Sequence, residues 1–233
     1  MRTYLFYALG EVVLIVFGIL IAIQLNALNE SRKQDTKRTQ LIERLDRQIE
    51  INQIQAEEAI VELQIQLADI TAVMSYIGKP KAAIDTAAID SIMSSIIEDH
   101  HLGLDLTTLQ EALDNGEISN LEDENLRTSL YSLLKANERL EQREDIANHD
   151  NNNFTIPFMY KKVNSRNAAA RTDEEYQKYV GPSNLPPTDY EALFADREFE
   201  NLVGSRFYYA REMMMNYQRI ASFLVYLDGE LEK

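Results

Sequence analysis

The stretch that decides the fold is residues 42–77, IERLDRQIEINQIQAEEAIVELQIQLADITAVMSYI. Apolar residues or alanine recur in it at alternating spacings of three and four, which places their side chains on one face of an α-helix. The pattern therefore predicts one long helix that buries this face. The seam consists of Ile42, Leu45, Ile49, Asn52, Ala56, Ala59, Leu63, Gln66, Ile70, Val73 and Ile77.

Two positions of this seam, Asn52 and Gln66, are polar, and the helix has a clear stop. Pro80, after Gly78 and Lys79, cannot continue a helix and restricts the residue before it. A polar residue inside a coiled-coil seam sets the register of the helices. A polar residue at the border of a seam instead marks the edge of a bundle, and the pattern leaves both interpretations open for Asn52 and Gln66.

On the N-terminal side lies the apolar run Tyr4 to Leu28, YLFYALGEVVLIVFGILIAIQLNAL, in which Glu11 is the single charged residue. With a rise of about 1.5 Å per residue the run spans roughly 37 Å, enough to cross a hydrocarbon core of about 30 Å. It is too long for the core of a signal peptide, and it lacks the polar face of a helix that lies on the membrane. We predict a transmembrane anchor at residues 1–31, with the lipid bilayer as partner, and a helical domain at residues 32–233.

The orientation of this anchor depends on two opposing rules. Arg32, Lys33, Lys37 and Arg38 follow the span and outnumber Arg2 before it, which favours a cytoplasmic C-terminal side. Long domains after a single N-terminal anchor are nevertheless exported largely regardless of charge. These local residues therefore leave the orientation open.

Composition narrows the class of protein. The 233 residues carry a formal net charge of −15 and contain no cysteine. Nucleic acid is disfavoured as a partner, because phosphate binding needs clustered Lys and Arg. The absence of cysteine excludes disulfides, thiolate metal sites and cysteine nucleophiles.

The rest of the chain also shows helical periodicity, and no segment shows sustained strand-like alternation. We therefore predict an all-α fold in which the N-terminal transmembrane helix continues into a long helix of an elongated bundle or coiled coil. The final helix is expected to pack back along the first. Its seam is Phe199, Val203, Arg206, Ala210, Met213, Tyr217, Ile220, Leu224, Leu227 and Leu231; a third seam is Leu126, Leu130, Leu133, Asn137, Leu140, Glu144 and Ala147; a shorter one is Ile89, Ile92 and Ile96.

Local signals suggest where the shorter helices begin and end. Capping-box spacing, in which a hydroxyl residue precedes an acid by three positions, predicts helix starts. Asn115-Gly116 and Gly181-Pro182 predict stops. Residues 149–187 combine an asparagine run with several prolines and are predicted to be the least helical segment. The capping pairs are Thr108 with Glu111, Thr172 with Glu175, and Thr188 with Glu191.

The sequence around the span resembles the N-terminal signature of an uncharacterised family of single-span membrane proteins common in Bacteroidota, Y-x-x-Y-A-x-G-E-I-x-L-V-x-x-G-I-L-I-A-L-Q-I-N-x-W-N-E. Asn115 to Ile118 with Asn125 to Arg127, and Phe199 to Arg206 with Tyr217, resemble further blocks of it. The resemblance implies a plasma-membrane anchor with an exported C-terminal domain and implies no activity. The residues that match the signature are Tyr4, Tyr7, Ala8, Gly10, Glu11, Leu14, Gly18, Ile19, Leu20, Ile21, Ala22, Gln24, Asn26, Asn29 and Glu30.

Three residues of the span are candidate helix-contact residues: Glu11, Gly18 and Ala22. They share one helical face with Ile15 and Leu25, and Gly18-x-x-x-Ala22 has the spacing that lets two membrane helices approach closely. A carboxylate inside a bilayer is costly, so Glu11 is either buried in a contact between copies or extends toward the nearer interface. Both interpretations remain open.

Catalytic patterns are weak. His100 and His101 are adjacent, so on a helix they would point about 100° apart and could not chelate one metal as an i, i+4 pair does; a solvated helix end is expected there. We predict no catalytic residue, no metal and no cofactor. The favoured function is a noncatalytic membrane-anchored interaction scaffold that forms a homo-oligomer and contacts another envelope membrane protein. The alternative is a transport or gating subunit that uses Glu11 in an ion or proton path.

Overall fold

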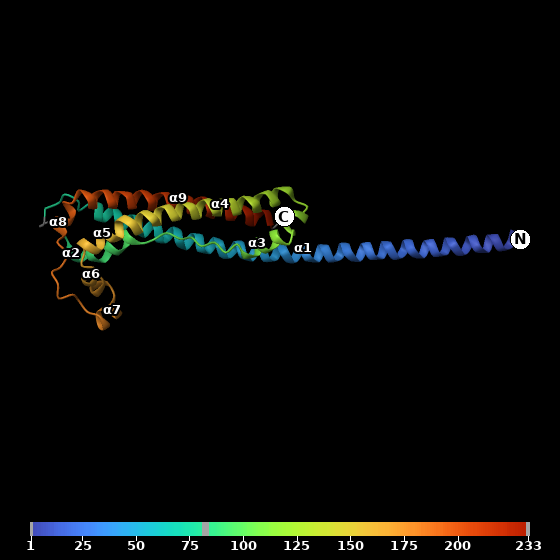
Figure 1. The fold of residues 1–233 in the computed structure, drawn as a ribbon, viewed down its shortest axis with the longest axis horizontal. Helices are drawn as coiled ribbons and strands as arrows, with labels where there is room; N and C mark the ends of the chain where they lie inside the picture. The colour runs from blue at the N-terminus through green and yellow to red at the C-terminus, as the bar shows by residue number, and fades with distance from the viewer. Residues whose placement is uncertain (1, 81–83, 232–233) are drawn as a thin grey trace.

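The computed structural model describes residues 2–80 and 84–231, with the side chains of residues 2–13, 171 and 172 left out. Its dominant element is α1, a single helix over Arg2–Met74. The apolar span and the seam from Ile42 to Val73 therefore belong to one continuous helix, as predicted, whereas the last seam residue, Ile77, lies in the turn that follows. Figure 1 shows α1 leaving the rest of the protein as a straight rod that ends at the N-terminus.

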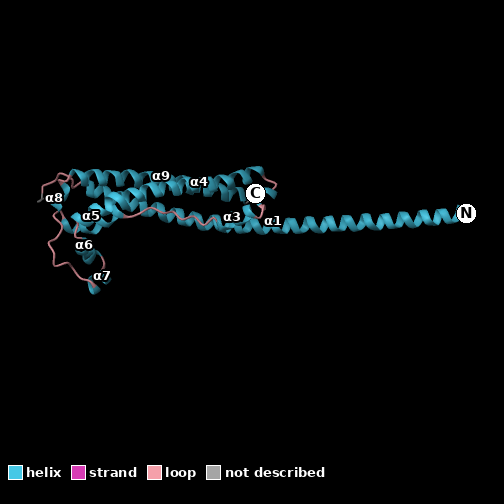
Figure 2. Ribbon diagram, in the orientation of Figure 1, coloured by secondary structure: helices cyan, strands magenta, loops and turns pink. Residues whose placement is uncertain are grey.

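Two further long helices, α4 over Glu124–Asp150 and α9 over Arg197–Leu231, complete an elongated bundle with the C-terminal half of α1. α9 lies along α1 for most of its length and also contacts α4. The C-terminus lies at the end of the bundle from which α1 departs (Figure 1). Every residue of the seam predicted for α9 is buried. The all-α prediction is confirmed, and the residues that the structure describes form no strand (Figure 2).

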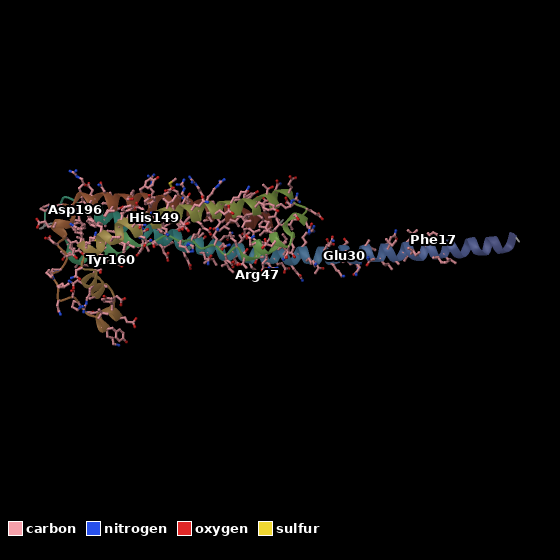
Figure 3. The ribbon with its side chains drawn as sticks, in the orientation of Figure 1. Phe17, Glu30, Arg47, His149, Tyr160 and Asp196 are labelled. Atoms are coloured by element: carbon pink, nitrogen blue, oxygen red, sulfur yellow. The ribbon has the colours of Figure 1, made fainter. Side chains whose placement is uncertain are left out.

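The bundle begins at Leu41, which is 4% exposed, whereas every side chain from Leu14 to Gln40 is exposed. Residues 29–40 thus form a bare, polar stretch of α1, which we call the neck; by helical rise it is about 18 Å long. At the end of the neck next to the bundle, the Arg38 guanidinium lies 3.0 Å from the Glu122 carboxylate. Figure 3 shows the neck between Phe17 in the span and Arg47 in the bundle.

The predicted stop after α1 is confirmed. Gly78 has a positive φ of 73°, a conformation that favours glycine. Its backbone N–H donates to the Phe194 carbonyl oxygen at 3.0 Å, and Phe194 belongs to α8, Tyr190–Phe194. The Tyr76 and Phe194 rings stack at 5.9 Å. The turn after α1 is thereby fixed to the segment that leads into α9.

Between α1 and α4 the chain forms α2 over Thr86–Ile92, η2 over Met93–Ile97, α3 over Thr107–Asp114 and η3 over Ile118–Asn120. Residues 98–106, which we call the strap, link η2 to α3 without helical structure. Figure 2 shows the strap running lengthwise along the long helices. It lies between α1 and α4, and an Arg44–Glu111 ion pair of 2.6 Å fastens α3 to α1.

The three predicted capping positions were each misplaced by a short distance. An aspartate carboxylate, not a threonine hydroxyl, accepts the first free N–H groups: Asp105 from Thr107, Asp173 from Tyr176 and Asp189 from Ala192. Carboxylates are good N-terminal acceptors and also favour the positive end of the helix dipole. The predicted stops at Gly116 and Gly181 are confirmed by positive φ angles of 71° and 66°.

The segment at residues 149–187 is more helical than expected. α4 continues through one π-helical turn, η4 over Asn151–Thr155, into α5 over Ile156–Lys162; α6, Ser165–Thr172, and α7, Glu174–Tyr179, follow. The asparagines do not break the helix, because Asn152 and Asn153 each donate to the carbonyl four residues earlier at 2.8 Å. The wide turn ends at Thr155, two residues before Pro157, whose missing N–H disturbs the regular helical ladder.

Candidate functional site

The predicted contact face of the span is open in the structure. A Cβ atom built on Gly18 would meet nothing within 4 Å, and Ala22 is exposed. Glu11 lies within the helical backbone of α1, but its side chain is outside the described part of the structure. A second helix could therefore approach α1 closely at Gly18 and Ala22.

The titratable and amide side chains buried in the bundle form a second candidate site, and they converge on the strap. From α1, the Asn52 amide donates to the Asp105 carbonyl at 2.7 Å and accepts from the Asp105 N–H at 2.8 Å. Gln66 donates to the Ser95 carbonyl at 2.8 Å. Both predicted interpretations of these two residues were wrong: they neither pair between helices nor lie at an edge, but bind the backbone of η2 and the strap.

α4 contributes the same kind of contact from the opposite side. Asn148 donates to the His100 carbonyl at 2.8 Å and accepts from the His100 N–H at 2.9 Å. Asn151, in the π-helical turn, donates to the Ile97 carbonyl and to the Asp99 carboxylate, both at 2.8 Å. Side-chain amides thus pair with an extended backbone as a neighbouring strand would.

α9 supplies Arg206, which is fully buried. Its Nε donates to the Ile96 carbonyl at 2.9 Å, one terminal nitrogen donates to the Glu98 carbonyl, and the other lies 3.4 Å from the Ala147 carbonyl. Burial lowers the pKa of Arg206, and the nearby Asp99, Asp150 and Glu98 carboxylates oppose that shift. Arg206 therefore gathers the carbonyl ends of η2 and α4 at one point.

Glu144 of α4 is the buried acid of this cluster. Its Oε1 accepts from the Leu102 N–H at 2.8 Å and from the Tyr217 hydroxyl at 2.7 Å. Its Oε2 lies 3.3 Å from Nδ1 of His101, whose side chain is 75% exposed. Burial, followed by the hydrogen bond to Glu144, raises the pKa of Tyr217. The carboxylate and phenol hold the strap against α9.

The histidine pair does not form the solvated helix end that was expected. His100 is 4% exposed and lies in the strap, and its Nε2 has no hydrogen-bond partner among the described residues. Burial, reinforced by the Arg206 charge, lowers the pKa of His100 to about 4. Across the described residues, no three His, Cys, Asp or Glu side chains are grouped so that they could hold a metal ion.

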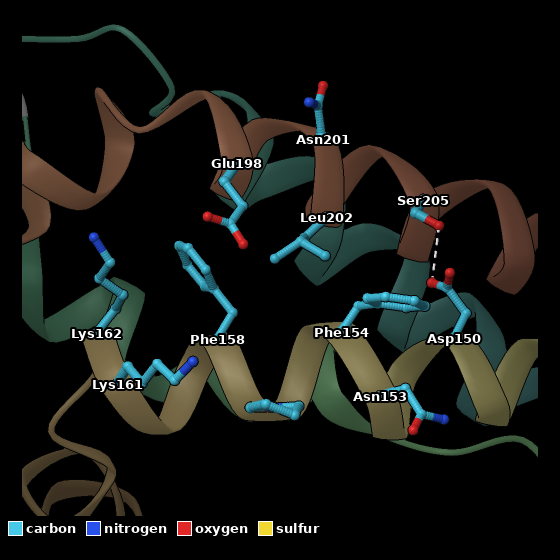
Figure 4. Close-up of a pocket in the computed structure, with 11 residues that line it drawn as sticks. Asp150, Asn153, Phe154, Phe158, Lys161, Lys162, Glu198, Asn201, Leu202 and Ser205 are labelled. Atoms are coloured by element: carbon cyan, nitrogen blue, oxygen red, sulfur yellow. Dashed lines mark hydrogen bonds between the residues drawn. The ribbon is translucent and has the colours of Figure 1, made fainter.

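A surface groove of about 450 Å³ lies between the start of α9 and the helix made by η4 and α5. Figure 4 shows Phe154, Phe158 and Leu202 along it, with Lys162 at one end and the Asp150–Ser205 hydrogen bond at the other. Lys162 is occupied, since it lies 3.1 Å from Asp196. The groove is shallow and mixed in polarity, and the one hydroxyl among its lining residues, that of Ser205, donates to the Asp150 carboxylate at 3.0 Å.

We call the buried or half-buried polar groups that hold η2, the strap and the first turn of α3 the polar belt: Gln48, Asn52, Gln66, Glu144, Asn148, Asn151, Arg206 and Tyr217. Sequence reasoning missed the belt as a unit. Its signal was the polar residues inside the apolar seams, Asn52, Gln66, Glu144 and Arg206. The same signal at Asn137 marks no belt residue, because Asn137 bonds to Glu141 within α4. No protein-family model, curated protein or solved structure matches this chain.

Proposed function

We propose that this protein is a noncatalytic scaffold of a bacterial cell envelope, anchored in the plasma membrane by the first part of α1 and self-associating through that span. Its bundle presents an acidic helical surface to another envelope membrane protein. The observation that carries the proposal is the open face of α1, because every described side chain from Leu14 to Gln40 is exposed and the one ion pair from this stretch to the bundle is that of Arg38 with Glu122.

The span supports self-association through its small residues. α1 is the one described helix long and apolar enough to cross a membrane. In a bilayer, helices associate by close van der Waals packing rather than by the hydrophobic effect, and small residues four apart permit that approach. The open space at Gly18 supplies the geometry that such a contact requires.

The polar belt supports a structural rather than a catalytic role for the bundle. Arg206, Glu144 and Tyr217, which in other proteins perform acid–base or anion-binding work, here hold backbone groups of η2 and the strap. A buried polar network in which most members are paired rigidifies a fold. The bundle is thus built to keep one shape.

The proposal places the bundle on the extracytoplasmic side, in keeping with the resemblance of residues 4–30 to single-span proteins of Bacteroidota. A long domain after one N-terminal anchor translocates largely regardless of the basic residues in the neck. A cysteine introduced into this cysteine-free chain at Gln64 should react with a membrane-impermeant maleimide in intact spheroplasts; protection until lysis would place the bundle in the cytoplasm.

The self-association is tested by substitution in the span. Gly18→Leu should fill the space between the helices and lower the dimer fraction of the full chain in detergent micelles at least tenfold, measured by sedimentation equilibrium. Val16→Leu is the matched control, because it adds bulk about 160° away around the helix. Glu11→Ala tests whether the carboxylate takes part. An unchanged mass for both Gly18→Leu and Glu11→Ala would contradict the contact.

A further inference from the structure

A second face of α1 is unpartnered within the bundle itself. Ile51, Ile54, Val61 and Ile65 are exposed by 50%, 53%, 53% and 59%. They lie on the side of α1 turned away from its buried seam, and Figure 3 labels Arg47 on the same outer side. Their spacings of three, seven and four residues are those of the a and d positions of a coiled coil. We call these four residues the α1 stripe.

The α1 stripe is bordered by acids. Glu50 and Glu57 lie along one edge, Glu62 along the other, and Glu58 within it, and all four are exposed. Among the described side chains, no Lys, Arg or His nitrogen forms an ion pair with any of them. The stripe therefore combines helical apolar anchors with a negative border; residues 48–78 contain no Lys, Arg or His, and the preceding cation, Arg47, lies one turn before Ile51.

We propose that the α1 stripe docks a helix of another envelope protein, one whose own apolar seam is flanked by Lys and Arg. The four carboxylates favour a basic partner helix over a second copy of this chain. A second copy in parallel register would place Glu58 opposite Glu58 and Glu57 beside Glu62, and like charges at these positions oppose pairing. A basic flank would neutralise the same four carboxylates. This inference rests on the proposed scaffold function and names the chemistry of its partner.

A lipid surface is a poor alternative occupant. Ile51 lies 23 residues beyond the end of the span at Leu28, which by helical rise is about 35 Å above the membrane boundary. α1 is straight through the neck (Figure 1), so it holds the stripe away from the bilayer. Acidic borders would also be repelled by anionic headgroups.

The stripe lies above the contact face of the span. Ile15, Gly18 and Leu25 precede Ile51, Ile54 and Val61 by 36 residues each, which is ten turns of an α-helix. Self-association leaves the stripe open, because helices joined through small residues typically cross at about 40°, which separates the axes of two copies by roughly 30 Å at Ile51.

The probe for this site is a four-heptad peptide with Ile at a, Leu at d and Lys at e and g. It is titrated by fluorescence anisotropy into the full chain held in zwitterionic lipid nanodiscs, with empty nanodiscs as blank. Wild-type chain should bind it, and Ile54→Ser with Ile65→Ser should weaken binding at least tenfold. Val225→Ser with Met215→Ser is the matched control, because these α9 side chains are also exposed, by 60% and 44%.

Charge reversal sharpens the test. The variant Glu58→Lys with Glu62→Lys should no longer bind the lysine peptide. It should instead bind a peptide with the same Ile and Leu seam but with Glu at e and g. Equal binding of a scrambled lysine peptide, or binding indifferent to the stripe substitutions, would overturn the proposal. A lower sedimentation mass for the Ile54→Ser, Ile65→Ser chain alone would assign the stripe to a second copy instead. Gly18→Leu should leave peptide binding unchanged. A failure of self-association through the span can therefore be distinguished from a failure of docking at the α1 stripe.

Discussion

Arg206 is a buried cation that lies against carbonyl groups and forms no ion pair with a carboxylate among the described residues. Carbonyl oxygens at the ends of helical segments carry partial negative charge, so several of them can offset much of the cost of removing a guanidinium from water. Five donors in a planar fork suit this task, because they reach several acceptors at once. The residue thus joins three segments of the chain at one point.

Replacing Arg206 by methionine should destabilise the bundle by about 3 kcal/mol, because the Ile96 carbonyl would be left buried without a donor and the Glu98 carbonyl would keep only the 3.3 Å bond from Gln66. Arg206→Lys should recover only part of that loss, since one ammonium group cannot span the same acceptors. Urea unfolding of the full chain in micelles, followed by circular dichroism, measures the change. Arg211→Met on the exposed face of α9 is the control; equal effects of the two methionine variants would contradict this role.

His100 makes stability depend on pH. Its pKa in the folded protein is about 4, lowered by burial and by Arg206, whereas an unfolded histidine has a pKa near 6.5. Between these values the unfolded chain binds a proton that the folded chain does not, so the free energy of unfolding rises with pH from about 4 to about 6.5. The contribution is complete above that window, is lost below it, and amounts to about 3 kcal/mol.

The variant His100→Gln isolates this contribution from the carboxylates that titrate in the same range. Urea unfolding at pH values from 4 to 7 should give a shallower pH dependence for His100→Gln than for the wild type, by up to one bound proton. His149→Gln is the control, because His149 is exposed on α4. If the free energy of unfolding depended on pH in the same way for the wild type and His100→Gln, the folded protein would tolerate a protonated His100, and the prediction would be wrong.

At the scale of elements, the strap takes the place that a fourth helix would occupy in a four-helix bundle. A helix satisfies its own backbone, whereas an extended segment must find partners elsewhere or leave buried groups unpaired. α1 and α4 provide these partners with Asn52 and Asn148, each of which both donates to and accepts from the strap backbone. The long helices therefore bind the strap much as a protein binds an extended peptide.

Asn52→Ala should cost about 2 kcal/mol, because both backbone groups of Asp105 lose a partner. Its local signature is faster amide hydrogen exchange in residues 102–106 than in the core of α9, measured by mass spectrometry on the full chain. Asn137→Ala removes an amide that bonds only within α4, to Glu141, and should leave the strap protected. A uniform increase in amide exchange over the whole bundle would mean that the strap unfolds only together with the rest of the bundle.

The sequence predicted the helices well because helical periodicity is local. Each seam repeats within a single element, so the buried positions of α1, α4 and α9 follow from spacing alone. The polar belt does not repeat in this way: Asn52 and Asp105 are 53 residues apart in the chain, and nothing beside either residue indicates the other. Residues 149–162 were mispredicted because asparagine and proline usually break helices, whereas here the Asn152 and Asn153 side chains donate to carbonyls in the last turn of α4.

At the scale of the whole molecule, α1 connects the span to the bundle without a break. No glycine or proline interrupts the neck, and the bundle fixes α1 from Leu41 onward. The angle at which two spans cross should therefore be transmitted to the bundles. This continuity distinguishes α1 from an anchor joined to its domain by a flexible linker, in which the two parts would be independent.

If the chain self-associates through its span as proposed, distances between the two copies should report that transmission. With a crossing angle of about 40° near Gly18 and Ala22, the two α1 helices diverge by about 1 Å for each residue along the chain. Spin labels on single cysteines at Thr36, Ile51 and Ile65 should therefore give double electron–electron resonance distances that increase in that order, by roughly 30 Å in all. Inserting two glycines after Thr36 should broaden the distributions at Ile51 and Ile65 and leave the label at Thr36 narrow. Nearly equal distances at the three sites would instead indicate a left-handed supercoil that continues from the span along the bundle, and would place the α1 stripe between the two copies.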